Sequence, residues 1–525
     1  MINNSSGSSR PVNVQPLPRR TFLGAAVAGG ATSLFTRFPM PLAAQSQPSD
    51  LTRLSASSLS AAIRARETSC REVMQAYLAR IQRYNGVYNA IVSMPGDDEL
   101  MRLAAEADHD LEQGRYRGWM HGMPHAVKDL ANARGFPTVK GSPLLTGSAA
   151  EADDLFISRI RSAGAIFIGK TNTPEFGYGS QSYNPVFGPV RNAYDPRLTS
   201  GGSSGGAAVS LAAHMLPSAD GSDMMGSLRN PAAFNNVIGF RPSQGRIPRH
   251  PTGDMFYQQL ATGGPMGRNV EDTIRLLHSI AGPDPRYALG RTDEIPDYEA
   301  FQPRGLEGFK IGWLGSYDGY LAMEPGVLGV CEKNLELLGG HGAVVERCRP
   351  QYDMARLWQT WLTFRHWSAR WVKEYYDDPA KRRQLKPEVV WEYEGGLEMT
   401  AEQLYDAGVA RSQWYEALLA LFDQYDVLAL PSAQVFPFPA DVHWPKSIDG
   451  REMDTYHRWM EVVIGGTLSG LPVAGLPAGF SDGGLPMGMQ FIGRMGEDVA
   501  LLEFAMAYEA ATGHLDRRPE LRESL

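Results

Sequence analysis

Cysteine is scarce in this 525-residue chain, and the few cysteines present show no pairing pattern. Cys70, Cys331 and Cys348 are odd in number, lie far apart, and form no CxxC motif and no Cys/His group with the spacing of metal ligands. This pattern excludes a disulfide framework and gives no sign of a cysteine-based metal site. We therefore expect free, buried thiols, and neither a metal nor a cofactor.

Positive charge is also limited and is not clustered. The formal net charge is -8 at pH 7, and the sequence contains no block of lysine and arginine. Nucleic acids and anionic membranes attract clustered positive charge, so we expect no nucleic-acid partner and no stable membrane association. Only nine of the 50 basic residues are lysines, which makes a lysine in an apolar segment an unusual choice.

The N-terminal segment has the layout of an export signal. It reads PLPRRTFLGAAVAGGATSLFTRFPMPLAAQSQ, in which Arg19 and Arg20 precede a short, weakly apolar run that ends near Ala44. A membrane span needs about 20 apolar residues, and Arg37 interrupts this run too early. The arrangement predicts a twin-arginine signal peptide and linker over residues 1–50, and a periplasmic protein. The alternative is a disordered leader on a cytoplasmic protein, with a chance arginine pair.

Beyond residue 50, apolar runs of strand length alternate with helical segments. The stretch SASSLSAAIRARETSCREVMQAYLARIQRYN has apolar residues at helical spacing, with serine and threonine placed to cap helix starts. Strands that return between helices predict an α/β fold with a largely covered central sheet. No linker divides residues 51–525, which we interpret as one large domain. The strand candidates are AIFIGK (165–170), FKIGWLG (309–315), VLALP (427–431), LPVAGLPAGF (471–480) and GMQFIGR (488–494).

The segment 352–378 is unusually rich in aromatic residues. At helical spacing such a stripe is more typical of packed core, or of a flap over a pocket, than of a membrane anchor, because arginine and lysine are interleaved with it. A wall that faces the substrate is a further interpretation. The aromatic residues include Trp358, Trp361, Trp367, Trp371, Tyr375 and Tyr376.

The stretch TSGGSSGGAAV offers a first candidate nucleophile. GGSSG places Ser203 in a G-x-S-x-G pattern, which in α/β-hydrolases marks a nucleophile that follows a buried strand. The preceding NAYDPRLTS is polar and contains Asp195-Pro196, so it cannot be such a strand. The alanine-rich AAVSLAAHML that follows predicts a glycine-rich loop over residues 201–206 that enters a helix and offers backbone N–H groups to an anion.

The stretch ADGSDMMGSLRNPAA offers a second serine. Asp223 and Arg229 bracket a turn of small residues and can pair beneath it. Such a pair would hold successive backbone N–H groups toward one space, which is what a developing oxyanion requires, with Ser227 within reach. The amides in question are those of Met224, Met225, Gly226 and Ser227.

A serine hydroxyl needs a base to act as a nucleophile. The eleven histidines are scattered, and none lies in a stretch typical of a catalytic triad. Lys128 ends the apolar run GWMHGMPHAVKDL, and desolvation lowers the pKa of a lysine, which can make the amine a base near neutral pH. A surface lysine whose stem packs on apolar side chains is the plainer interpretation of that residue taken alone.

Taken together, these segments resemble the amidase signature family of serine hydrolases. The family joins a lysine in a P-x-A-V-K-D context to a GGSSGG loop and then to a G-[ST]-D-x-G-G-S-[IL]-R-x-P turn. The corresponding stretches here are MPHAVKDL, SGGSSGGAAV and GSDMMGSLRNPAA, with Ser203 75 positions after Lys128 and Ser227 24 positions after Ser203. GKTNTPEFGYG, YDVLALPS and SGLPVAGLPAGFSDGGLPMGMQFIGR extend the likeness over nearly all of the chain from about residue 50.

This resemblance implies a fold with a large central mixed β-sheet covered by helices on both faces. It also implies a catalytic Ser-cisSer-Lys triad. Ser227 would be the nucleophile that forms the acyl-enzyme. Ser203, in a cis peptide after Gly202, would relay the proton, and Lys128 would be the base that takes the proton and later returns it to the leaving amine.

The resemblance also assigns residues around the triad. Ser204 and Ser222 would be structural and donate to the loop backbone. Gly177 and Tyr178, in FGYG, match positions that line the acyl pocket. The chain departs from the family at Met225, where a glycine is usual, so the turn either needs no positive φ there or has a different geometry. His125 is a smaller departure, since many relatives have an aliphatic residue at that position.

The expected activity is hydrolysis of a linear carboxamide, an aryl amide or carbamate among the options, through an acyl-enzyme on Ser227, with a small-molecule amide as partner. The aromatic segment favours an aryl or bulky apolar substrate. Two alternatives stand beside this one: a Ser-His-Asp esterase that uses Ser203, and an inactive periplasmic amide-binding protein with the same fold. The sequence leaves the oligomeric state open between a monomer and a homodimer.

Export predicts a processed N-terminus. Because signal peptidases cut after small residues, the mature protein recovered from a periplasmic fraction should begin close to Gln45. Intact-mass measurement and N-terminal sequencing check this. A periplasmic protein that still begins at Met1 would contradict the predicted signal.

Overall fold

The computed structural model describes residues 50–249, 254–257 and 259–525. All of the predicted signal peptide and linker except Asp50 lies outside the described residues. Residues 48–525 group into one compact unit.

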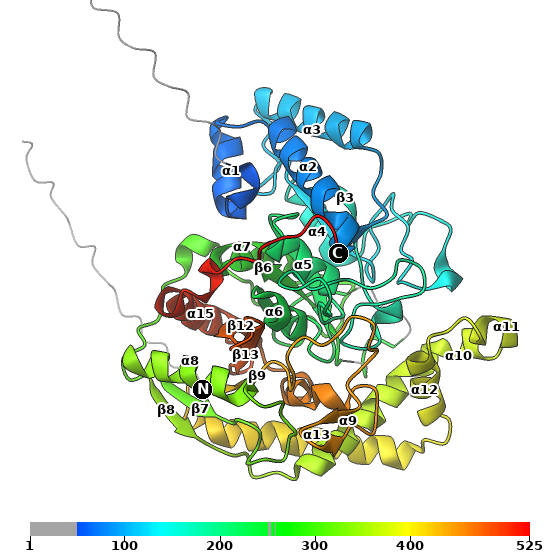
Figure 1. Cartoon of the computed structure of the whole chain (residues 1–525), viewed down its shortest axis with the longest axis vertical. Coiled ribbons are helices and arrows are strands. Elements are labelled where there is room, and N and C mark those ends of the chain that lie inside the picture. The colour runs from blue at the N-terminus through cyan, green and yellow to red at the C-terminus, as the bar shows by residue number, and fades with distance from the viewer. Residues whose placement is uncertain (1–49, 250–253, 258) are drawn as a thin grey trace, which may run out of the picture. The chain divides into compact units, whose positions relative to one another are not determined.

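The strands form one large sheet and two small ones (Figure 1). Their bounds are β1 (Ile91–Val92), β2 (Pro124–Lys128), β3 (Ile166–Thr171), β4 (Ala219–Asp223), β5 (Ile238–Arg241), β6 (Thr262–Gly267), β7 (Lys310–Trp313), β8 (Val344–Arg347), β9 (Val427–Pro431), β10 (Ser447–Ile448), β11 (Arg451–Glu452), β12 (Val473–Phe480) and β13 (Pro486–Ile492). The large sheet has the order β4-β6-β5-β12-β13-β9-β7-β8, antiparallel from β4 to β9 and parallel from β9 to β8. The small sheets are β1-β3-β2 and the β10-β11 pair.

The helices account for most of the remaining regular structure. The α-helices are α1 (Ala56–Ala65), α2 (Cys70–Tyr88), α3 (Asp97–Glu112), α4 (Leu155–Ser162), α5 (Gly205–Ala212), α6 (Arg229–Asn235), α7 (Val270–Ile280), α8 (Val327–Gly340), α9 (Met354–Ser368), α10 (Lys373–Tyr376), α11 (Pro379–Arg382), α12 (Pro387–Gly395), α13 (Ala401–Phe422), α14 (Ile464–Ser469) and α15 (Asp498–Thr512). The 3₁₀ helices are η1 (Leu51–Arg53), η2 (Pro143–Leu145), η3 (Glu175–Gly177), η4 (Tyr298–Ala300), η5 (Ala369–Val372), η6 (Arg458–Val463) and η7 (His514–Asp516).

Helices cover both faces of the large sheet, and alternate residues of β13 show which helices these are. On one face Gly488 makes room for α6, since a Cβ at that position would lie 2.8 Å from the Cβ of Ala233. On the other face Met489 Sδ accepts a hydrogen bond from Asn334 of α8 at 3.3 Å, and Asn334 also donates to Tyr508 of α15 at 2.8 Å. Successive side chains of a strand point to opposite faces. The predicted α/β fold with a large mixed sheet between helices is therefore confirmed.

Local sequence explains where the first helices begin and end. Ser55 Oγ accepts the N–H of Ser58 at the start of α1, and Ser69 forms a capping box with Glu72 at the start of α2. Between them Arg66 adopts φ +60°, which ends the helix in the left-handed region. The predicted helical stretch is thus two capped helices.

The predicted strands are confirmed with small shifts of their ends: they correspond to β3, β7, β9, β12 and β13. The cysteines are free, but only Cys70 and Cys331 are buried, whereas Cys348 is half-buried. In the part of the chain that the structure describes, no helix is both long and apolar enough to cross a membrane.

The aromatic segment divides between core and surface. It forms α9, η5 and α10, and α9 packs against α13. Trp358 and Trp361 are buried in the main hydrophobic core. Trp371 is 44% exposed and lines a pocket. Both predicted roles, packed core and a wall that faces a pocket, therefore occur in the same segment.

Candidate active site

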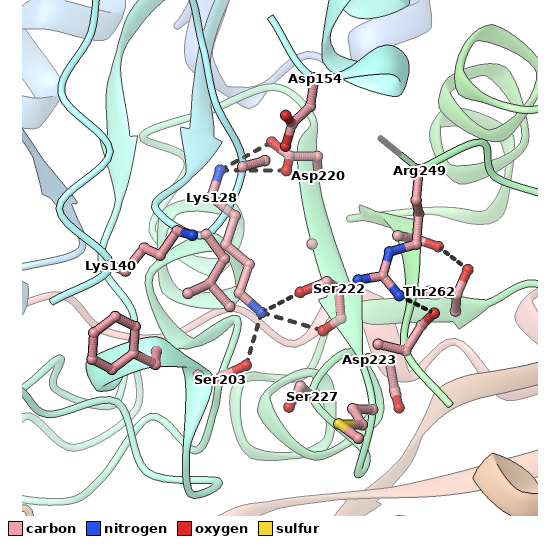
Figure 2. A pocket seen from close by; sticks show the side chains of 18 of the residues that line it. Lys128, Lys140, Asp154, Ser203, Asp220, Ser222, Asp223, Ser227, Arg249 and Thr262 are labelled. Carbon is pink, nitrogen blue, oxygen red and sulfur yellow. Dashed lines mark hydrogen bonds between the residues drawn. The ribbon is translucent and has the colours of Figure 1, made fainter. Parts of the chain in front are cut away.

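The side chain of Lys128 lies at the centre of the site. The residue ends β2, which packs against β4, and it is only 1% exposed. Its Nζ atom lies 2.8 Å from Ser203 Oγ, 3.0 Å from Ser222 Oγ and 3.2 Å from Ser222 O (Figure 2). It also lies 2.7 Å from Ser204 Oγ. The resemblance implies that Ser204 and Ser222 serve the loop backbone. Ser204 Oγ does lie 3.4 Å from the carbonyl of Ser222, but both hydroxyls also contact the lysine amine directly.

This environment suits a neutral amine. Burial lowers the pKa of the Lys128 ammonium to about 7, although the carboxylates of Asp220 and Asp223 act in the opposite direction. A neutral amine has two N–H donors and one lone pair. The carbonyl of Ser222 can only accept, but each surrounding hydroxyl can also donate. The lone pair of the amine can therefore accept a proton from a hydroxyl while its two N–H groups donate to other partners.

A buried carboxylate and a histidine lie behind the lysine. Both oxygens of Asp220 accept the backbone N–H of Lys128 at 3.3 Å, and His125 Nε2 lies 3.0 Å from Asp220 Oδ1. His125 Nδ1 has no hydrogen-bond partner among the described residues. Because a carboxylate oxygen only accepts, the ring donates from Nε2 to Asp220. His125, a departure from the family pattern, thus holds the carboxylate beside the lysine.

The glycine-rich loop brings Ser203 and Ser204 to the amine. As predicted, the loop runs directly into a helix, α5. The peptide between Gly202 and Ser203 is cis, as the resemblance implies. Gly206 admits close approach, since a Cβ there would lie 2.5 Å from backbone atoms of two neighbouring segments. The N–H of Ser204 donates to the carbonyl of Ser227 at 3.2 Å, which joins the loop to the turn that bears the second serine.

A buried ion pair supports that turn. Nε and Nη2 of Arg229 each donate to the Asp223 carboxylate at 3.0 Å, and Arg241 Nη1 lies 3.3 Å from it. Burial by itself raises the pKa of the Asp223 carboxyl, but the two guanidinium groups outweigh burial and hold that pKa well below its usual range. The carboxylate also accepts the N–H groups of Gly226 and Leu228 at 2.9 and 3.2 Å. The predicted pairing of Asp223 with Arg229 is confirmed.

The direction of the Gly226 amide differs from the prediction. The sequence predicts that four successive amides face one space, but the N–H of Gly226 points back to the Asp223 carboxylate. The amides of Met224, Met225 and Ser227 donate to no other described residue. Three donors, not four, are therefore available to an oxyanion.

The two adjacent methionines play different parts in the turn. The positive φ of the turn falls on Gly226 (φ +75°), and Met225 is not among the residues with positive φ. A Cβ on Gly226 would also lie 2.8 Å from the side chain of Val463, so glycine is required there and not one position earlier. The side chain of Met225 is 7% exposed and belongs to the core, whereas that of Met224 lines the pocket.

The serines open into a pocket of about 320 Å³. Ser203 and Ser227 both line it, and Ser227 Oγ has no hydrogen-bond partner among the described residues. Gly177 and Tyr178 line it as well, in the place that the sequence predicts. A Cβ on Gly177 would lie 2.8 Å from Leu130 and 3.6 Å from Ser203 Oγ, so a larger residue would crowd the loop.

One wall of the pocket is aromatic. Trp371 comes from the segment that the sequence analysis interpreted as a substrate-facing wall, whereas Phe176 and Arg365 were not singled out as site residues. The rings of Phe176 and Trp371 meet edge to face with centroids 4.9 Å apart. The Arg365 guanidinium lies over the ring of Tyr178 at 3.9 Å, and its Nη1 contacts Met224 Sδ at 3.1 Å. Phe176 lies in FGYG, but Arg365 and Trp371 come from α9 and η5, almost 200 positions later. No local pattern connects them with the serines.

Asp220 and Ser222 carry a sequence signal that is easily missed. They lie two positions apart on β4, and both contact Lys128. If ADGSD is recognised as a strand, its period of two places these side chains on one face.

In the described residues, no group of three or more His, Cys, Asp and Glu side chains is arranged to hold a metal ion. No histidine in this part of the chain hydrogen-bonds to Ser203 or Ser227.

Comparison with known proteins agrees with this geometry. The family model described as Amidase matches residues 72–502. The chain belongs to the amidase family. As an amidase, the protein is a hydrolase of amide C–N bonds, as the sequence predicts.

Known amidase relatives cover nearly the whole chain. The acylamidase of Rhodococcus erythropolis is 30% identical over 473 residues, which span 89% of this amidase and 97% of the relative. One subunit of the glutamyl-tRNA(Gln) amidotransferase of Cyanothece sp. is 32% identical over 482 residues, 87% of this chain and 98% of that one. A bacterial aryl acylamidase of the amidase signature family superposes with a TM-score of 0.83 at 26% identity, covering 89% of this chain and 99% of that one.

The two methionines of the turn should respond differently to truncation. Met225→Ala removes a core side chain and should lower the free energy of unfolding by about 2–4 kcal/mol. Met224→Ala should cost less stability but raise KM for an amide substrate more, because this side chain lines the pocket. Denaturant unfolding and steady-state kinetics of both variants check the ranking. The reverse order would contradict the placement of the two side chains.

Proposed function

We propose that this amidase hydrolyses a small linear amide through an acyl-enzyme on Ser227. The observation that carries the proposal is the 2.8 Å contact between Lys128 Nζ and Ser203 Oγ at the edge of the pocket that Ser227 also lines. A buried amine with a pKa of about 7 is a suitable general base near neutral pH.

The proton path follows from the order of these groups. Ser227 Oγ attacks the carbonyl carbon and gives its proton to Ser203 Oγ, which gives its own proton to Lys128 Nζ. The proton then returns by the same route to the leaving nitrogen as the C–N bond breaks and the acyl-enzyme remains. Water enters by the same general-base path, so that the acyl group leaves as a carboxylic acid and Ser227 is regenerated.

The negative charge of the tetrahedral intermediate needs donors in the turn. The free amides of Met224, Met225 and Ser227 are suited to this role, and the buried Asp223–Arg229 pair fixes the turn that carries them. Donors that are fixed before the reaction stabilise developing charge without reorganisation.

The pocket favours an aryl or bulky apolar group beside the scissile amide. Phe176 and Trp371 provide an aromatic wall, and aromatic pairs prefer offset or edge-to-face contacts such as a bound aryl ring can make. The similarity to an acylamidase and an aryl acylamidase supports this choice. A formal net charge of -8 argues against a tRNA-linked substrate, despite the similarity to a glutamyl-tRNA(Gln) amidotransferase. With the twin-arginine pattern at Arg19 and Arg20, we place the reaction in the periplasm.

A serine-directed reagent tests the nucleophile. Fluorophosphonate treatment followed by intact-mass measurement and peptide mapping should give a single adduct on Ser227. Ser227→Ala should give no adduct and no measurable hydrolysis of an anilide such as acetanilide. Ser204→Ala, which removes a neighbouring hydroxyl, should still react at Ser227. An adduct on Ser203 would contradict the assignment, and the absence of any adduct would favour an inactive amide-binding protein.

The pH profile tests the base. Because Lys128 must be neutral to accept a proton, kcat/KM should fall about tenfold per pH unit below pH 7 and level off above it. Asp220→Asn removes a carboxylate that raises the pKa of Lys128, so it should move the profile to lower pH. The other charged group beside the amine is Asp223, and His125 contacts Asp220. A profile that is flat from pH 6 to 8 would contradict the role of Lys128.

A further inference from the structure

Two positively charged side chains line the pocket with no described carboxylate in contact. We propose that Lys140 and Arg249 form a subsite for an anionic group of the substrate, so that the preferred amide carries a carboxylate in addition to the scissile bond. This inference rests on the proposed amide hydrolysis and specifies the charge of its substrate.

Lys140 belongs to the loop that follows β2. Its backbone carbonyl accepts the N–H of Phe176 at 2.8 Å, which fixes the residue beside the aromatic wall. The side chain is half-buried and lines the pocket. In the described part of the chain, its ammonium makes no hydrogen bond, and no carboxylate lies within 4.0 Å of it. In Figure 2 the side chain of Lys140 extends toward that of Lys128.

Arg249 lies on the other side of Lys128 in Figure 2. Its Nη1 donates to the carbonyl of Ala261 at 2.8 Å, and no described carboxylate lies within ion-pair distance of the guanidinium. Burial lowers the pKa of this guanidinium, while Tyr287 and the carboxylate of Asp154 act in the opposite direction. A cation placed in this way gains from any anion that enters the pocket.

The pocket lining contains further charged side chains. Asp154 is a carboxylate in the lining, and the N–H of Asn132 donates to it at 3.1 Å. Arg365 is paired with Glu392 at 3.0 Å. Burial raises the pKa of Glu392, but Arg365 and His366 together lower it to about 2. At neutral pH Glu392 is therefore ionised, and its carboxylate remains paired with Arg365.

The described lining also includes three carboxylates, those of Asp154, Asp220 and Asp223. Asp220 lies beside Lys128, and Asp223 is held by two buried guanidinium groups. None of the three forms a described ion pair with Lys140 or Arg249, and a partly desolvated charge without a close partner is unfavourable. An aryl amide with a carboxylate would place its ring against the aromatic wall and its charge near Lys140 or Arg249.

Binding to the inactive Ser227→Ala protein tests the subsite without turnover. Two matched pairs of probes place the carboxylate on either side of the amide: 4-acetamidobenzoate against 4′-methylacetanilide, and N-phenylsuccinamate against N-phenylbutanamide. In at least one pair, calorimetry should show a Kd at least tenfold lower for the anion. Adding Lys140→Met or Arg249→Met should reduce this ratio at least fivefold, and so should 0.5 M NaCl, because salt screens partly exposed charges.

Exposed cations outside the pocket serve as controls. Lys333→Met and Arg71→Met, both on exposed positions of α8 and α2, should leave the ratio unchanged. Neutral probes that bind as tightly as the anions, or an anion preference that survives both pocket substitutions, would overturn the proposed subsite. Failure of the proposed function is a separate result: the unsubstituted protein would hydrolyse none of the four amides, whatever their affinities.

Discussion

The buried ion pair between Asp223 and Arg229 is the interaction on which the site depends. All five N–H donors of Arg229 are paired: two with Asp223, and the others with the carbonyl of Val463, the amide oxygen of Gln490 and the hydroxyl of Thr467. A buried charge is tolerated only when it is paired and hydrogen-bonded. This requirement brings β4, η6, β13 and α14 to one point and fixes the turn that carries the candidate nucleophile.

The chemistry of the lysine follows from the same arrangement. Asp223 is the last residue of β4, and the same strand carries Asp220 and Ser222. Both contact Lys128, which ends β2, a strand of the small sheet that packs against β4. Burial of the amine works against its protonation, while two carboxylates work in favour of it, and the balance lies at a pKa of about 7. A surface lysine would stay charged, and a lysine buried without these carboxylates would be neutral at lower pH. The site therefore sets the proton affinity of its base through distance and burial.

The pocket above the serines combines segments from distant parts of the chain. The FGYG loop supplies Phe176, Gly177 and Tyr178, which line the same pocket as Ser203 and Ser227. This loop belongs to one of the stretches that resemble the family. Trp371 and Arg365 come from a region whose aromatic pattern fits packed core equally well, and neighbouring residues of that pattern do pack in the core. The fold and the family were predictable because capping residues, glycine-rich loops and strand-length apolar runs act locally. The composition of the pocket wall could not be predicted in the same way, because it depends on which face of α9 and η5 meets the site.

The sequence by itself determined the residue types of the proposed catalytic group, since Lys128, Ser203 and Ser227 stand in short motifs whose spacing is visible in one dimension. It also predicted that Asp223 and Arg229 pair beneath the turn. Only the tertiary structure decided that Gly226 directs its N–H back to Asp223 and that Met225, unlike its neighbour, enters the core. The turn is held by Arg229, which bonds Gln490 of β13, and Gly226 lies against Val463 of η6. Segments so far apart in the chain meet only when the protein has folded.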